Sequence, residues 1–283
     1  MKLPLSAIIL TYNEEKNIQA CLESVKNFVQ DIFIVDSFST DQTLSIAKKY
    51  TDKILQHEFE NYGKQRNWAL DNLPIKTEWV LNLDADHRVT DKLKEELCEM
   101  FSTKEHLDYN GLLVSRKTIF MGKWIRYGGH YPVYHCPIFK DKQGKCEETL
   151  YDQHFLVNGK LKKIKGDIED IVSESLDTFI NRHNKWSTLE ALSQTSNNST
   201  QNSWDGRICG NEIEKRRFMK NNIFMIMPLF FRSFIYFNYR YFFRLGFLDG
   251  KEGLIFHFLQ GCWFRFLVDA KIYETRKKSK IKV

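Results

Sequence analysis

Short apolar runs alternate with segments of helical periodicity over the first hundred residues. The runs that predict strands are residues 6–10, 31–35, 53–56, 78–83 and, further on, 112–120. Helical spacing is found over residues 14–28, 41–50, 63–70 and 91–101, with Asp41 placed to cap the second helix. This alternation predicts an α/β fold with a parallel sheet and crossover helices. In such sheets, ligands bind beyond the carboxyl ends of the strands.

The pattern changes after Gly111. Residues 121–172 are rich in Gly, His, Tyr and Asp and are predicted to be irregular, whereas residues 175–193 have the spacing of a long helix. A polar segment, residues 194–210, follows and is predicted to form a loop. We therefore expect a main domain over residues 1–195, a linker over 196–212 and a helical region over 213–283.

Charge is distributed unevenly along the 283 residues. The chain has 42 Lys and Arg against 36 Asp and Glu, yet residues 215–283 alone hold 15 basic and 4 acidic residues. The rest of the chain is therefore net acidic. Nucleic-acid binding usually requires a basic face on the main domain, so we expect no nucleic-acid partner.

The basic C-terminal region is also unusually aromatic. Residues 215–250 contain 12 aromatic residues, 7 Lys or Arg and a single acid, Asp249. Its longest uncharged stretches, residues 221–231 and 253–264, are too short to span a bilayer. This pattern predicts helices lying in the membrane interface, with aromatic rings among the lipids and Arg and Lys on lipid phosphates. The alternatives are a helical subdomain packed on the main domain and a homodimer interface.

Two features indicate a cytoplasmic setting. None of the six cysteines forms a CxxC pair, so we expect reduced thiols. The apolar run at residues 5–10 is followed by Asn13, Glu14 and Glu15, where a signal peptide would need a small-residue cleavage site.

Polar residues follow three of the predicted strands. They are Thr11–Glu15, Asp36–Asp41 and the triplet Asp84-Ala85-Asp86. Each group alone is explained by helix capping, but three groups at one sheet edge indicate a site. Two carboxylates at positions i and i+2 after a strand suit a hard cation such as Mg²⁺ or Mn²⁺.

Four segments resemble family 2 glycosyltransferases in order and spacing. They are AIILTYNEE (residues 7–15), VDSFSTDQT (35–43), GKQRN (63–67) and LDAD (83–86). The later part of the chain is similar to the branch that builds bacterial envelope polysaccharides, including lipopolysaccharide core. The resemblance implies a GT-A fold, with a mostly parallel sheet flanked by helices and a C-terminal helical region that associates with the membrane.

The resemblance also implies roles for individual residues. Nucleotide-sugar binding falls to Thr11, Asn13, Glu14, Asp36, Lys64, Arg66, Asn67 and Asp84, and metal binding to Asp84 and Asp86. Among these, Asp36 would contact the base, and the GKQRN residues would lie near the diphosphate. For Lys64 and Arg66, a solvated helix face is the alternative. His87 replaces an acidic residue that many relatives carry, and we expect it on the surface.

An inverting transferase needs a general base to take the proton of the acceptor hydroxyl. The resemblance places this base in the segment 151–155, and we predict Asp152. Glu147 and Glu148 are alternatives, and a turn-forming role for Asp152 is another. We expect His154 to make a structural hydrogen bond.

Together these features predict a metal-dependent, inverting glycosyltransferase. It would move a sugar from a nucleotide diphosphate donor to a glycan or lipid-linked acceptor in envelope polysaccharide synthesis, peripherally on the inner face of the cytoplasmic membrane. The alternatives are transfer to a polyprenyl phosphate and a non-catalytic membrane-associated scaffold of polysaccharide assembly. The intact Asp84, Asp86 and Asp152 argue against the scaffold.

Overall fold

The computed structural model describes residues 2–149, 153–173, 175–195, 218–219, 222 and 224–281. The chain divides into two compact units. The first comprises Met1–Lys117 and His135–Ile171, and the second comprises Thr118–Tyr134 and Val172–Val283. The domain boundaries predicted above stay a prediction, although the helix before residue 195 groups here with the C-terminal helices.

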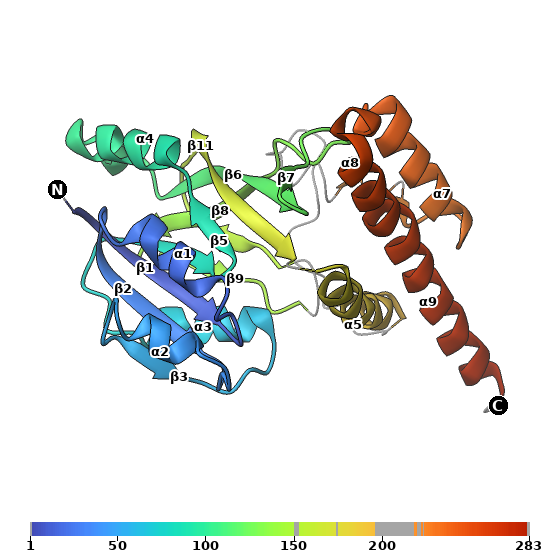
Figure 1. Ribbon diagram of the computed structural model, residues 1–283, viewed down its shortest axis with the longest axis horizontal. Helices are drawn as coiled ribbons and strands as arrows, with labels where there is room; N and C mark the ends of the chain where they lie inside the picture. The colour runs from blue at the N-terminus through green and yellow to red at the C-terminus, as the bar shows by residue number, and fades with distance from the viewer. Residues whose placement is uncertain are drawn as a thin grey trace. The chain divides into compact units, whose positions relative to one another are not determined.

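Four parallel strands form one half of the sheet in the first unit (Figure 1). They lie in the order β3 (Ile54–Gln56), β2 (Val29–Asp36), β1 (Leu3–Thr11) and β4 (Trp79–Asp84). Thr11 pairs with Asp36, and Leu10 pairs with Asp84. The three polar groups after these strands therefore meet at one edge of the sheet, as predicted.

Helices follow the parallel strands as the periodicity predicts. They are α1 (Ile18–Val25), α2 (Thr43–Ala47), α3 (Tyr62–Asn72) and α4 (Asp91–Ser102). Helix α1 shows the packing principle, because its buried side chains recur at i, i+3, i+4 and i+7. The N-cap of α2 is Gln42 and not Asp41 as predicted, and Asp41 lies one residue earlier, where its Oδ1 accepts the Thr43 N–H at 2.9 Å.

The other half of the sheet extends through a segment that we predicted to be irregular. Beyond β4 the order continues β8 (Tyr134–Lys140), β6 (Gly111–Phe120), β11 (Leu161–Ser173) and β5 (His87–Val89), with β7 (Lys123–Trp124) beside β6. Strands β8 on β4 and β11 on β5 are antiparallel. A separate hairpin pairs β9 (Gly144–Cys146) with β10 (Phe155–Val157). The prediction that residues 121–172 are irregular was therefore wrong. In β11, polar residues separate the buried Ile164 and Ile168, and its many charged residues hid this strand pattern in the sequence.

The second unit is helical in its C-terminal part. It contains α5 (Leu176–Thr195), α7 (Phe231–Asn238), α8 (Gly250–His257) and α9 (Phe264–Ile281). Two π-helical segments, η3 (Tyr239–Phe243) and η5 (Phe258–Trp263), and a 3₁₀ helix, η4 (Gly246–Asp249), lie between them. Helix α5, predicted from the spacing of residues 175–193, packs against α9. A buried apolar cluster of the second unit consists of Phe120, Ile125, Phe179 and Phe256. Among the described residues, no helix is both long and apolar enough to cross a bilayer.

Three arginines of this region point inward, which corrects the expectation that its arginines face lipid phosphates. Arg232 Nε donates to Asp269 Oδ1 at 2.8 Å, and Arg265 Nη1 donates to Glu190 Oε1 at 2.8 Å. Arg240 Nε donates to the Gly128 carbonyl at 2.7 Å. These guanidinium groups therefore stabilise the helical packing of the second unit.

Candidate active site

The ends of β1 and β2 are joined by side chain to backbone hydrogen bonds. Asn13 adopts a left-handed conformation with φ of 52°, which asparagine tolerates, and its Oδ1 accepts the Thr40 N–H at 2.8 Å. Thr11 is buried at the strand end, and no described residue hydrogen-bonds its Oγ1. A buried hydroxyl without a partner is costly, so a polar ligand atom at this edge would satisfy it.

Asp36 and Glu14 lie at the same edge of the sheet, and both carboxylates already accept hydrogen bonds from other residues of the protein. Asp36 is fully buried and accepts hydrogen bonds from the Ser39 backbone N–H at 2.9 Å, from Gln56 Nε2 at 3.0 Å and from Ser39 Oγ. Glu14 Oε2 accepts from Asn17 Nδ2 at 2.8 Å. A carboxylate can accept about four hydrogen bonds, so Asp36 keeps capacity for one more donor while it shapes the loop after β2.

Asp84 lies in a network with Arg66 and Tyr62. Arg66 is 1% exposed, and its Nη2 donates to Asp84 Oδ1 at 2.6 Å and to the Leu83 carbonyl at 2.7 Å. The Tyr62 hydroxyl donates to Asp84 at 2.8 Å. Burial opposes the ionisation of Asp84, but the positive charges of Arg66 and Arg116 and the Tyr62 hydrogen bond outweigh it and lower the pKa of this carboxyl. Asp84 is therefore a carboxylate held in one orientation.

His87 is buried, so our expectation that it lies on the surface was wrong. It follows Asp86 directly into β5, and its Nδ1 accepts the Asp84 backbone N–H at 3.1 Å. Burial lowers the pKa of His87 to about 4, which leaves the ring neutral at pH 7. A neutral ring that accepts at Nδ1 carries its proton on Nε2, and this atom lies 3.6 Å from Asp84 Oδ2 and 3.9 Å from Asp86 Oδ1.

The cluster of Asp84, Asp86 and His87 fits a divalent cation through its two carboxylates. One possible ligand atom of each residue lies within 4.8 Å of the other two. The proton on His87 Nε2 leaves this nitrogen no lone pair for a metal ion, so the two carboxylates are the candidate ligands. Oxygen ligands from Asp84 and Asp86 are those that Mg²⁺ and Mn²⁺ prefer.

Helix α3 buries some of the GKQRN residues (63–67) and leaves Lys64 exposed. Arg66 points into the sheet, whereas Lys64 is on the surface and pairs with Glu60. The solvated-face alternative is therefore wrong for Arg66. Lys64 lies on the exposed face of α3, and its predicted role near the diphosphate stays a prediction. Asn67 is buried and makes two hydrogen bonds with the Cys146 backbone. Its Oδ1 accepts the Cys146 N–H at 2.8 Å, and its Nδ2 donates to the Cys146 carbonyl at 2.9 Å. Its Nδ2 also lies 3.0 Å from Glu148 Oε1. Asn67 thus ties α3 to the segment before the predicted base.

Gly63 permits this close approach. A Cβ atom on Gly63 would lie 2.1 Å from the Glu147 carbonyl oxygen. Glu147 itself is buried, and its Oε2 accepts the His154 backbone N–H at 3.0 Å. Asp152 lies outside the described residues, so its prediction as the base stays a prediction.

Two residues that act on Asp84, Tyr62 and Arg116, were not found from the sequence. Arg116 on β6 pairs with Asp170 on β11 at 3.4 Å, and Asp170 lies opposite His87 across the β11–β5 pairing. The positive charge of Arg116 contributes to the lowered pKa of Asp84. The available sequence signal is a charged residue within the largely apolar run of residues 111–120, but its partner on β11 is evident only once that charged segment is recognised as a strand.

The comparisons identify the class of protein to which this site belongs. The sequence profile of glycosyl transferase family 2 matches residues 6–155, more than half of the chain. The chain therefore belongs to glycosyl transferase family 2. It is a glycosyltransferase with the α/β GT-A architecture described above.

Particular relatives are similar over nearly the whole chain. The lipopolysaccharide core biosynthesis glycosyltransferase LpsC of Rhizobium meliloti (strain 1021) is 28% identical, and the alignment covers 96% of this chain and 93% of LpsC. The uncharacterized glycosyltransferase RT0209 of Rickettsia typhi is 25% identical over 98% of this chain and 89% of its own length. Among solved structures, S. aureus TarS 1–349 has a TM-score of 0.46 and 17% identity, covering 99% of this chain and 92% of that one.

Proposed function

We propose that this glycosyltransferase transfers a sugar, with inversion, from a nucleotide diphosphate-sugar to a glycan or lipid-linked acceptor of the bacterial envelope. The observation that carries the proposal is the pair of carboxylates Asp84 and Asp86 at the same sheet edge as the Thr11 hydroxyl, which no described residue hydrogen-bonds. The name of the relative LpsC supports a role in lipopolysaccharide core synthesis.

Asp84 and Asp86 would hold Mg²⁺ or Mn²⁺, which supplies positive charge to the departing diphosphate. Arg66 and Tyr62 keep Asp84 ionised and oriented, so this carboxylate needs no rearrangement when the donor binds. Thr11, Asn13, Glu14 and Asp36 are proposed to contact the nucleotide, and Lys64 the diphosphate or its sugar. Arg66 and Asn67, which are engaged within the protein, would act by positioning their neighbours.

The proposed base remains Asp152, with Glu147 and Glu148 as alternatives. Glu148 is held by Asn67 and Glu147 by the His154 backbone, so both have a structural function in the described chain. We expect Asp152→Asn to reduce kcat by at least 100-fold, as loss of a general base usually does. A larger loss in Glu148→Gln than in Asp152→Asn would reassign the base.

We further propose a cytoplasmic location with peripheral attachment to the inner face of the membrane. The aromatic and basic composition of residues 215–250 supports attachment, and the free thiols of the described cysteines are compatible with a reducing compartment.

The donor site is tested by thermal unfolding with UDP, GDP, dTDP or CMP, each with and without Mn²⁺. A nucleotide at 100 times its Kd stabilises by about 2.7 kcal/mol, which raises the unfolding temperature by several degrees. We expect a metal-dependent shift with one nucleotide, its loss in Asp86→Asn, and its retention in Asp71→Asn, an exposed carboxylate on α3. A folded protein that responds to no nucleotide, or an Asp86→Asn variant that responds like the wild type, would refute the proposed site. Mass analysis of the product then distinguishes glycan, lipid-linked and polyprenyl phosphate acceptors.

A further inference from the structure

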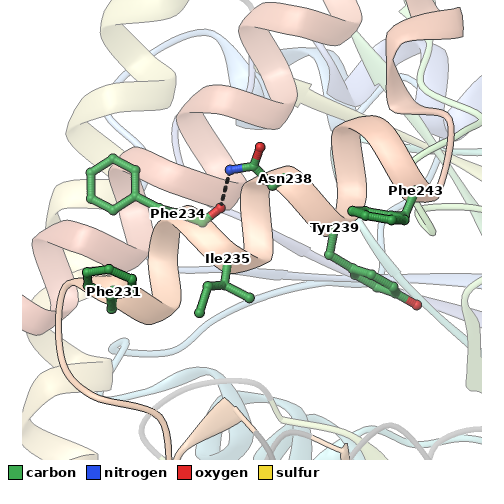
Figure 2. Close-up of a pocket in the computed structure, with 6 residues that line it drawn as sticks. All are labelled: Phe231, Phe234, Ile235, Asn238, Tyr239 and Phe243. Carbon is green, nitrogen blue, oxygen red and sulfur yellow. Dashed lines mark hydrogen bonds between the residues drawn. The ribbon is translucent and has the colours of Figure 1, made fainter.

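The outward side of α7 and η3 is apolar although it is exposed. Phe231 is 70% exposed and Phe243 is 79% exposed, and Phe234, Ile235 and Tyr239 lie between them with about half of their surface exposed. With Asn238 these side chains line a groove of about 550 Å³ (Figure 2). The Asn238 amide bonds back to the Phe234 carbonyl at 2.9 Å, so it adds little polarity to the face (Figure 2). Exposed apolar patches of this kind mark interaction surfaces.

The inward side of the same helix is polar. Arg232 is 2% exposed and is paired with Asp269, which is fully buried. Arg232 Nη2 also reaches Gln194 Oε1 at 3.1 Å, and the neighbouring Ser233 is buried. A helix at a water-exposed surface normally has the opposite polarity. The sequence therefore places its charges inside and its phenylalanines outside, an arrangement typical of a face that an apolar partner covers.

The exposed charges in this part of the chain indicate what kind of partner covers the apolar face. Between residues 226 and 262, all of which are described, the exposed charged side chains are Arg244 and Lys251. Asp249 is buried, and Glu252 is only partly exposed. An exposed aromatic face, in a part of the chain whose exposed charged side chains are both cationic, complements an anionic lipid surface. A second copy of this chain would present the same two cations, with no fully exposed acid between residues 226 and 262 to pair with them, which disfavours a self-partner.

We propose that the outward face of α7 and η3 inserts into the interface of an anionic phospholipid membrane. Phe231, Phe234 and Phe243 would lie among the upper acyl chains, and Arg244 and Lys251 would contact lipid phosphates. Arg232 and Arg240 hold the helical packing and make no lipid contact. This inference rests on the peripheral attachment proposed above and names the surface responsible for it.

The test is flotation of the full chain with vesicles of phosphatidylcholine alone or with 30% phosphatidylglycerol, a composition of about 7:3 chosen to supply anionic charge. Phe231→Ser/Phe243→Ser should weaken binding to the anionic vesicles by roughly 100-fold, since each buried phenylalanine contributes about tenfold or more. The control is Phe59→Ser/Leu107→Ser, which removes two apolar side chains of the first unit that are each 54% exposed. This control should bind like the wild type.

Three outcomes would overturn the proposal. They are a wild-type chain that fails to float, a Phe231→Ser/Phe243→Ser variant that floats like the wild type, and a lipid-free dimer that this variant dissociates. If the variant does not fold, hydrogen exchange of the wild type replaces it: amides of residues 231–243 must exchange more slowly with anionic vesicles. Asp86→Asn should float normally, so a failure of the proposed donor site leaves this result unchanged.

Discussion

The guanidinium of Arg66 offers the sharpest test of how the candidate site is held. It is 1% exposed and hydrogen-bonds to the Asp84 carboxylate at 2.6 Å, to the Leu83 carbonyl at 2.7 Å and to the Ile8 carbonyl at 3.3 Å. Arg66→Met preserves much of the side-chain volume but leaves all three oxygens without this donor. Removing one partner of a fully buried ion pair typically costs about 3–5 kcal/mol. Because the Asp84 side chain is 27% exposed and keeps the Tyr62 hydrogen bond, we expect the lower end, about 3 kcal/mol.

For a unit of this size, 1 kcal/mol lowers the unfolding temperature by roughly 2–4 °C, so Arg66→Met should lower it by about 10 °C. Differential scanning calorimetry is the suitable assay because it separates transitions of two units. Arg66→Met/Asp84→Asn removes both charges and should recover roughly 1–3 kcal/mol of the loss, the usual range for coupled neighbours. A loss below about 1 kcal/mol in Arg66→Met, or no recovery in the double variant, would refute the interpretation of Arg66 as the residue that holds Asp84.

Two further predictions test positioning and pH dependence. Gly63→Ala should separate α3 from Glu147, because the new Cβ would lie 2.1 Å from the Glu147 carbonyl oxygen. We expect this variant to lose at least tenfold in kcat in a transfer assay. The control Asp71→Ala, on the exposed face of α3, should keep the wild-type kcat. Equal activities in these two variants would contradict the requirement for close approach. Burial against Phe179 lowers the pKa of His183 to about 4. The folded state therefore excludes a proton that the unfolded chain binds, and stability falls as the pH decreases from about 6.5 to 4, by about 3 kcal/mol in total. His183→Gln should remove this part of the acid sensitivity in urea unfolding at pH 7 and pH 4.5, and an unchanged pH dependence would show that other groups cause it.

Local pattern was sufficient for the parallel half of the fold and for the edge that bears the site. Apolar runs of five or six residues followed by capping residues predict β1, β2 and β4 with their helices, because each signal lies within one element. The position of Asp84 and Asp86 follows from the same reasoning, since the residue after a parallel strand lies at its carboxyl edge. The resemblance to family 2 glycosyltransferases depends on these same segments, and it was confirmed.

The tertiary structure alone decided which charged and titratable side chains point inward. Arg66 and Lys64 occupy one short helix, yet Arg66 points into the sheet and Lys64 lies on the surface. Arg232 turns inward because Asp269, 37 residues further along the chain, is there to receive it. His87 is buried because β11 returns beside it and pairs Asp170 opposite. A charge is stable inside only with its partner, and the partner comes from a distant segment that local periodicity does not reveal.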